Sequence, residues 1–147
     1  MSSLDGKAPQ PGFMFVYGLL MQGFRLHSLL AGAQFLGRAT TRGCLVSLGE
    51  YPGLLDGDGT VHGELYRFTD IAAALKIVDP IEGFQDEDPE GSLYRRIART
   101  VHFLDGDPRA ETAWVYVFNQ CSDGAPEIAH GDYREYLASK KITINEP

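Results

Sequence analysis

The sequence predicts an α+β fold built on a largely antiparallel sheet that could close into a barrel. Its 17 glycines and 8 prolines fall between short apolar runs at fairly regular intervals, a spacing typical of strand-rich folds. These runs mostly follow one another without intervening helices, which favours antiparallel pairing over a doubly wound parallel sheet. Only residues 70–78 carry a strong helical pattern.

A chain of 147 residues corresponds to one domain. With 44% hydrophobic and 22% charged residues, the composition is close to the average of globular proteins. We expect a domain over residues 13–138, a flexible tail at residues 1–12 and a peripheral tail at residues 139–147. No apolar run is long enough to span a bilayer, and the N-terminal tail lacks the apolar segment of a signal peptide, so we expect a cytoplasmic protein.

The charge balance and the missing motifs exclude several classes of function. The 13 basic and 20 acidic residues give a net charge of -7, the wrong sign for binding nucleic acid or an anionic membrane. Cys44 and Cys121 can form at most one bridge, and neither lies at zinc-site spacing from another cysteine or a histidine. Phosphate-binding glycine loops and Gly-x-Ser-x-Gly elbows are also missing. We therefore expect neither a metal nor a nucleotide cofactor.

The first half of the chain is predicted to be rich in strands. Strand-like runs lie at residues 13–17, 34–38, 43–48 and 61–68. The first run is continuously apolar and ends at Gly18, as expected of a central strand that is covered on both faces. Residues 26–30 could form one short helix. Residues 51–59 contain two Asp-Gly pairs, which tolerate positive φ, and are predicted to form a hairpin loop.

The second half begins with the best helix signal. Thr69 or Asp70 can cap a helix over residues 70–78, where apolar side chains recur with helical spacing. Pro80 is expected to end or kink this helix. Two long strands are predicted after it, at residues 93–104 and 111–119, joined by a turn at residues 105–108.

The first candidate functional element is the exit of the central strand, Tyr17-Gly18-Leu19-Leu20. A glycine there lets the backbone turn sharply and present successive N–H groups, which can bind a carboxylate or an oxyanion. The simpler interpretation is an ordinary strand that ends in a turn.

The second candidate is Glu82. Positions 71, 75, 78 and 82 share one helical face, so a helix that continued past Pro80 would aim the Glu82 carboxylate toward the core. Desolvation there would raise its pKa and suit it to proton transfer near neutral pH. If Pro80 breaks the helix, Glu82 is instead one more solvated acid in an acidic loop.

Tyr94 and Arg96 fall on one face of the following strand by the two-residue period. They could place a phenol and a guanidinium beside the same pocket. An ordinary amphipathic strand with exposed arginines fits these residues equally well.

Taken together, these segments resemble the γ-glutamyl cyclotransferase-like (AIG2-like) family. The matching elements, in chain order, are Phe15-Val16-Tyr17-Gly18-Leu19-Leu20, Tyr51-Pro52-Gly53, Val61-His62-Gly63-Glu64-Leu65-Tyr66, Asp79-Pro80-Ile81-Glu82-Gly83-Phe84, Tyr94-Arg95-Arg96 and Trp114-Val115-Tyr116. No single element is specific, but their order and separations are. The resemblance covers most of the chain, and it implies a small mixed, mostly antiparallel β-barrel with flanking helices.

The resemblance also implies roles for individual residues. Backbone amides of Tyr17 to Leu20 would bind substrate, Glu82 would be the general acid/base, and Tyr94 would line the pocket. Leu19 departs from the family, which usually has Ser or Thr there, so a hydroxyl contact is lost while the N–H remains.

The implied reaction is attack by the α-amino group of a γ-glutamyl compound on its own γ-carbonyl, which gives 5-oxoproline and a free amine or amino acid. It requires no metal or organic cofactor. Two alternatives stay open, a non-catalytic binding protein for a small acidic metabolite and a related carbon–nitrogen bond reaction on another amide. The sequence does not name the leaving group or the oligomeric state.

Overall fold

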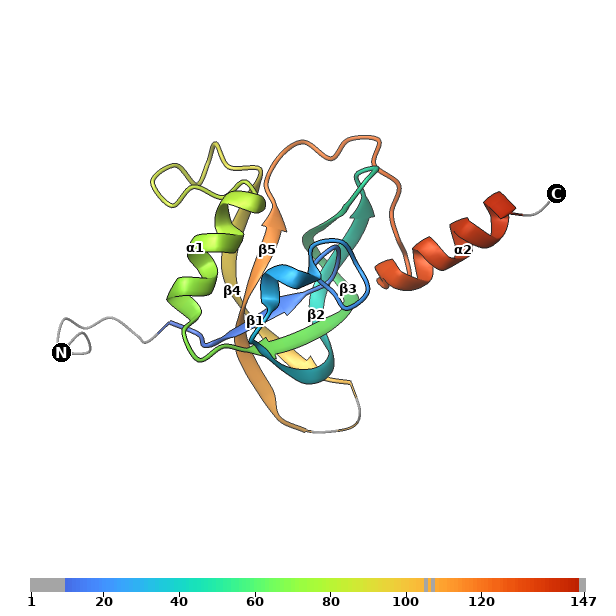
Figure 1. Ribbon diagram of the computed structural model, residues 1–147. Helices are drawn as coiled ribbons and strands as arrows, with labels where there is room; N and C mark the ends of the chain where they lie inside the picture. The colour runs from blue at the N-terminus through green and yellow to red at the C-terminus, as the bar shows by residue number, and fades with distance from the viewer. Residues whose placement is uncertain (1–9, 105, 107, 146–147) are drawn as a thin grey trace, which may run out of the picture.

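Five strands close into a barrel in the order β1-β3-β2-β4-β5 (Figure 1). The structure, a computed structural model, describes residues 10–104, 106 and 108–145, with side chains described as far as Lys140, so most of the expected N-terminal tail lies outside the described residues. The strands are β1 (Phe13–Val16), β2 (Gln34–Ser47), β3 (Pro52–Arg67), β4 (Tyr94–Phe103) and β5 (Ala110–Phe118).

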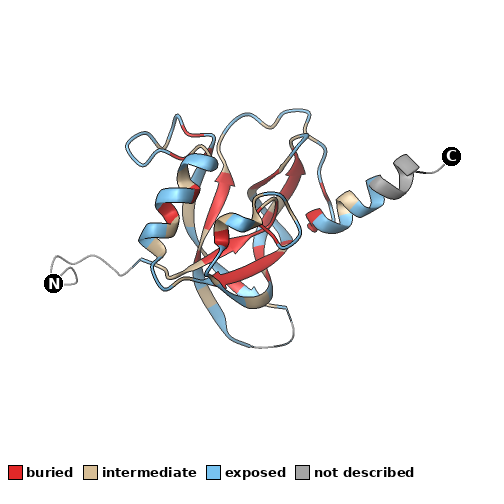
Figure 2. Cartoon of the chain, in the orientation of Figure 1, coloured by how far each residue is buried: buried red, intermediate tan, exposed pale blue. Residues whose placement is uncertain are grey.

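The barrel is mixed because one of its strand pairs is parallel. β1 runs parallel to β5 through the pair Met14 and Trp114, and the other neighbours pair antiparallel. Figure 2 shows that buried residues concentrate on the strands. The predicted α+β fold with a small, mostly antiparallel barrel is therefore confirmed.

β1 is the central strand that its apolar run predicts. Met14, Phe15 and Val16 are fully buried, between β3 on one side and β5 on the other. The strand leads directly into Tyr17 and Gly18, so the packing of β1 also fixes the start of the loop that follows.

The prediction of two strands at residues 34–38 and 43–48 was wrong, because both belong to β2. The strand continues through Gly43 across an irregularity in its pairing to β3, where the partner shifts from Thr60 opposite Arg42 to Leu55 opposite Cys44. The Gly43 position is too tight for a side chain, since an added Cβ would lie 2.9 Å from the Leu55 carbonyl oxygen. Five strands therefore form where six were expected.

The predicted hairpin loop at residues 51–59 was also wrong. The chain reverses before this segment, at residues 48–51, where the Leu48 N–H donates to the Tyr51 carbonyl and Gly49 has φ +103°. Residues 52–59 are then part of β3. The aspartate side chains of this segment are exposed to solvent and form ion pairs, Asp56 with Arg99 and Asp58 with Arg42. The strand therefore holds these aspartates without burying their charges.

Helix α1 (Ile71–Ile81) begins as expected and ends later than expected. The Asp70 side chain caps it by accepting from the Ala73 N–H. Pro80 lies inside the last turn, where it costs one backbone hydrogen bond and does not stop the helix. Gly83 ends it at φ +70°. The Phe84 N–H donates to the Asp79 carbonyl in the six-residue closure typical of a glycine-ended helix.

Two further helical segments flank the barrel. The expected short helix appears as a 3-10 helix, η2 (His27–Leu30). Helix α2 (Tyr133–Asn145) lies on the opposite side of the barrel from α1 (Figure 1). The boundary predicted between residues 138 and 139 therefore falls inside α2. No helix in the described part of the chain is long and apolar enough to cross a membrane.

We predict that Gly63→Ala destabilises the barrel by about 1–3 kcal/mol, the range for overpacking a tight core. The added Cβ would lie 2.2 Å from the Val16 carbonyl oxygen and 2.7 Å from the Phe15 ring, and would force β1 away from β3. Urea unfolding measures the change. Gly12→Ala is the matched control, because its Cβ would meet nothing closer than 4.0 Å, and an equal loss in both variants would contradict the account.

Candidate active site

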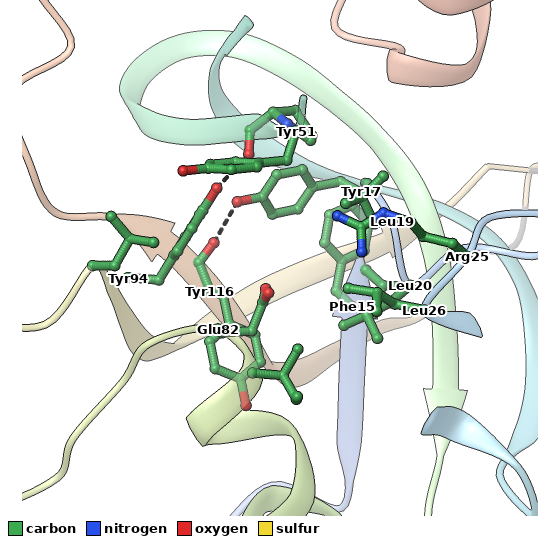
Figure 3. Close-up of a pocket in the computed structure, with 15 residues that line it drawn as sticks. Phe15, Tyr17, Leu19, Leu20, Arg25, Leu26, Tyr51, Glu82, Tyr94 and Tyr116 are labelled. Atoms are coloured by element: carbon green, nitrogen blue, oxygen red, sulfur yellow. Dashed lines mark hydrogen bonds between the residues drawn. The ribbon is translucent and has the colours of Figure 1, made fainter. Parts of the chain in front are cut away.

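One pocket, with a volume of about 300 Å³, lies where the end of β1, the start of β3, the end of α1 and the start of β4 meet (Figure 3). The residues that line it are Phe15, Val16, Tyr17, Gly18, Leu19, Leu20, Arg25, Leu26, Tyr51, Pro52, Ile81, Glu82, Leu93, Tyr94 and Tyr116. Of the seven residues singled out from the sequence, six are among them, Tyr17, Gly18, Leu19, Leu20, Glu82 and Tyr94, and Arg96 is not. The structure thus brings the two candidate elements and Tyr94 to one place.

The loop after β1 directs two backbone N–H groups away from its own hydrogen bonds. The Gly18 carbonyl accepts from the Met21 N–H and the Leu19 carbonyl accepts from the Leu26 N–H, both at 3.1 Å. In a trans peptide the N–H points opposite to the carbonyl, so the N–H groups of Leu19 and Leu20 point away from these contacts. Among the described residues neither N–H has an acceptor, which leaves both available to an anion.

The loop is tied to the barrel by a buried carboxylate. Glu64 accepts hydrogen bonds from the Gln22 N–H and the Tyr66 hydroxyl, both at 2.9 Å. Arg134 of α2 forms an ion pair with the same carboxylate at 3.0 Å and also donates to the Gln22 carbonyl. The loop conformation therefore depends on β3 and α2 as well as on its own sequence.

Glu82 is the residue that ends α1, and its backbone N–H donates to the Val78 carbonyl at 3.0 Å. Its carboxylate points into the pocket near Tyr17 (Figure 3). Burial raises the pKa of Glu82 from 4.5 to about 7. No described residue forms a hydrogen bond or an ion pair with this carboxylate. Near neutral pH the carboxyl group can therefore both accept and release a proton. The expectation that Pro80 ends or kinks the helix at this point was wrong, because α1 continues through Pro80 to Ile81; Glu82 therefore lines the pocket and is not a solvated acid of the acidic loop.

Two phenols form the wall opposite Glu82 (Figure 3). The Tyr17 hydroxyl donates to the Tyr116 carbonyl at 2.5 Å and accepts from the Leu54 N–H at 3.1 Å. The Tyr94 hydroxyl donates to the Pro52 carbonyl at 2.6 Å. Burial raises the pKa of both phenols far above the ordinary value, so both keep their protons and act as fixed walls.

Asp79 holds the end of α1 onto the barrel. Its carboxylate accepts from Arg96 Nε at 2.9 Å and Nη2 at 3.2 Å, and from the Tyr116 hydroxyl at 2.5 Å. The Arg96 guanidinium also lies 4.3 Å from the centre of the Trp114 ring. Arg96, which the two-residue period could have placed beside the pocket, does not line it, because its guanidinium is hydrogen-bonded to Asp79 of α1. It thereby positions the helix end that carries Glu82.

Sequence reasoning missed other residues of the site. Arg25 lines the pocket, but the shape of its loop comes from tertiary contacts and no local pattern marks it. Tyr51 packs against Tyr94 with ring centres 6.3 Å apart. The Gly83 that follows Glu82 is a signal for a helix end, and it could have placed Glu82 at the end of α1. Within the described residues, no group of three or more His, Cys, Asp or Glu side chains is arranged to hold a metal ion.

Comparisons with known proteins point to one family. Residues 14–135 match the family model described as gamma-glutamyl cyclotransferase, AIG2-like. The chain is 33% identical over 121 residues to the gamma-glutamylcyclotransferase family protein YtfP of Escherichia coli K12, which covers 82% of this chain and 94% of YtfP.

Solved structures show the same fold. The solution structure of Escherichia coli YtfP superposes with a TM-score of 0.59 at 34% identity, over 85% of this chain and 98% of YtfP. The crystal structure of an AIG2-like protein from Mus musculus superposes with a TM-score of 0.66 at 26% identity, over 85% of this chain and 89% of the mouse protein.

We predict that Asp79→Asn lowers the free energy of unfolding by about 3 kcal/mol, because it leaves the largely buried Arg96 guanidinium without its counter-charge. Urea unfolding measures the loss. The control is Asp58→Asn, which breaks an exposed ion pair with Arg42 and should cost less than about 1 kcal/mol. Equal costs in the two variants would show that the Asp79 contact does not hold α1 in place.

Proposed function

The chain belongs to the gamma-glutamyl cyclotransferase, AIG2-like family, and we propose that its pocket converts a γ-glutamyl compound into 5-oxoproline and a free amine or amino acid. The observation that carries this proposal is the Glu82 carboxylate. It lies in the pocket without a partner among the described residues, and its pKa is about 7. A group with that pKa exchanges protons efficiently at neutral pH.

The proposed reaction moves two protons from the α-nitrogen of the substrate to the leaving nitrogen. Glu82 takes a proton from the α-ammonium group, and the neutral amine attacks the γ-carbonyl carbon, so that a carbon–nitrogen bond closes the five-membered ring. Glu82 then gives this proton to the leaving nitrogen as its bond to the carbonyl carbon breaks, and takes the second proton from the ring nitrogen. The released amine takes up the second proton, which leaves 5-oxoproline and regenerates the Glu82 carboxylate. Because nucleophile and carbonyl belong to one molecule, the protein need only hold the folded substrate in place.

The N–H groups of Leu19 and Leu20 are proposed to bind the substrate carboxylate or the oxyanion that develops on the γ-carbonyl. They are suited to this because their own loop leaves them without acceptors. Leu19 lacks the hydroxyl of the usual Ser or Thr, but its N–H does not depend on the side chain. Loss of one such donor typically costs 10²–10³-fold in rate, about 2.7–4 kcal/mol.

Tyr17, Tyr94 and Tyr116 are proposed to shape the pocket without exchanging protons. The first two hydroxyls donate to backbone carbonyls and the third donates to Asp79. A pocket of about 300 Å³ is at the lower end of the range for small-molecule sites, which suits a substrate of dipeptide size.

We predict that Glu82→Gln folds normally and loses at least about 100-fold in 5-oxoproline formation, because the amide cannot exchange the proton. The measurement is mass spectrometry of 5-oxoproline released from γ-glutamyl amino acids, γ-glutamyl amines and glutathione. Glu87→Gln, in the neighbouring exposed acidic loop, is the matched control and should keep full activity.

Retained activity in Glu82→Gln would remove Glu82 from the mechanism. If wild-type protein binds a panel member saturably but releases no 5-oxoproline, the proposed reaction is wrong and the binding-protein alternative is favoured.

The pH dependence gives a separate prediction. Glu82 must be deprotonated to accept the substrate proton, so kcat/KM should be low in acid and rise through a midpoint near pH 7, the pKa of the free enzyme's carboxyl. A pH–rate profile measures this limb. An acidic limb with its midpoint near pH 4.5, the ordinary value, would contradict a desolvated Glu82 as the base.

A further inference from the structure

Arg25 is held at the edge of the pocket by the contacts of its neighbours. The Phe24 ring packs against Tyr133, with centres 5.9 Å apart, and the Arg134 guanidinium covers it at 5.0 Å. On the other side, the Leu26 N–H donates to the Leu19 carbonyl. With Phe24 and Leu26 both anchored, the Arg25 side chain lines the pocket and its guanidinium points inward beside Leu19 (Figure 3).

The charge of Arg25 is not neutralised within the described part of the chain. Most other arginines there form an ion pair: Arg38 with Asp132, Arg42 with Asp58, Arg96 with Asp79, Arg99 with Asp56 and Arg134 with Glu64. Arg25 has no such partner, although it lines a concave site in a chain of net charge -7. A guanidinium with free donors in a pocket is suited to a bidentate carboxylate ligand.

Arg25 and Glu82 act at separate places in the pocket. No ion pair joins them among the described residues, and burial is the cause that raises the pKa of Glu82. A nearby cation would lower that pKa instead. Arg25 is also exposed, which places it at the mouth, whereas proton transfer takes place at the desolvated carboxylate. In the proposed reaction the glutamyl part of the substrate lies against Glu82 and the Leu19 and Leu20 N–H groups, so the leaving group is the part that extends toward the mouth.

We propose that Arg25 is a specificity-determining residue that binds a carboxylate on the leaving group. The substrate class is then γ-glutamyl amino acids and peptides, and γ-glutamyl amines are poor substrates. This inference rests on the proposed function, since it assigns a leaving group to the same reaction. In this assignment the Leu19 and Leu20 N–H groups bind the carboxylate of the glutamyl part, and the Arg25 guanidinium binds the carboxylate of the leaving group.

The test compares two substrates that differ only in this carboxylate, γ-glutamyl-alanine and γ-glutamyl-ethylamine. In Arg25→Ala, kcat/KM for γ-glutamyl-alanine should fall about tenfold, the effect of losing one charge-assisted contact, while the value for γ-glutamyl-ethylamine stays within about twofold. Arg25→Lys should restore part of the preference, because the charge returns without the bidentate geometry.

Arg95→Ala is the matched control, because it removes the same charge from an exposed position outside the pocket. It should leave both substrates unaffected. An equal fall for both substrates in Arg25→Ala would overturn the proposal, since Arg25 would then contact the glutamyl part. The proposal would also be overturned if the ratio of kcat/KM between the two substrates were the same in Arg25→Ala as in the wild-type protein.

A binding measurement separates this inference from the proposed function. Calorimetric titration of wild-type and Arg25→Ala protein with the same two compounds gives a ratio of dissociation constants that does not depend on turnover. If neither compound is converted but Arg25→Ala loses the preference for γ-glutamyl-alanine, the proposed reaction fails and the role of Arg25 stands. If wild-type protein shows no preference in binding or in turnover, the role of Arg25 is wrong.

Discussion

The site depends on the ion pair between Asp79 and Arg96, because it fixes the end of α1 against β4 and β5. Asp79 accepts two hydrogen bonds from the guanidinium and one from Tyr116, so a single carboxylate joins the helix to both strands. Glu82 follows one turn later. With Gly83 ending the helix directly after it, the Glu82 carboxylate has little freedom to leave the pocket.

The pocket holds two charged side chains, Glu82 and Arg25, at different places. At its desolvated end, a carboxylate without a counter-ion among the described residues keeps a pKa near neutrality. At its mouth, Arg25 is exposed and forms no ion pair with any described residue. An arginine next to Glu82 would lower the pKa of the carboxyl and weaken it as a base. The separation of the two side chains therefore allows Arg25 to bind substrate without lowering the pKa of Glu82.

Sequence patterns predicted the parts of the structure that depend on interactions between residues close together in the chain. Helical phase placed Glu82 on the face it occupies, and the apolar run of residues 13–17 identified β1. The merging of two expected strands into β2 and the early turn at Gly49 were not predicted, because the Asp-Gly pairs of β3 signal a turn locally and their place in the strand depends on contacts with other strands, such as Asp56 with Arg99 and Asp58 with Arg42. Arg25 escaped because its loop is shaped by Glu64 and α2, which lie far away in the sequence.

The most direct test of the account is the titration of the Glu82 carboxyl itself. Carbon-13 NMR of protein labelled at the glutamate side-chain carboxyl, with Glu82→Gln to assign the resonance, gives the pKa in the absence of substrate. The account predicts a midpoint near pH 7, because burial penalises the charged form. A midpoint near pH 4.5 would show that the carboxylate is solvated and that the pocket does not hold the proton-transfer group assigned to it.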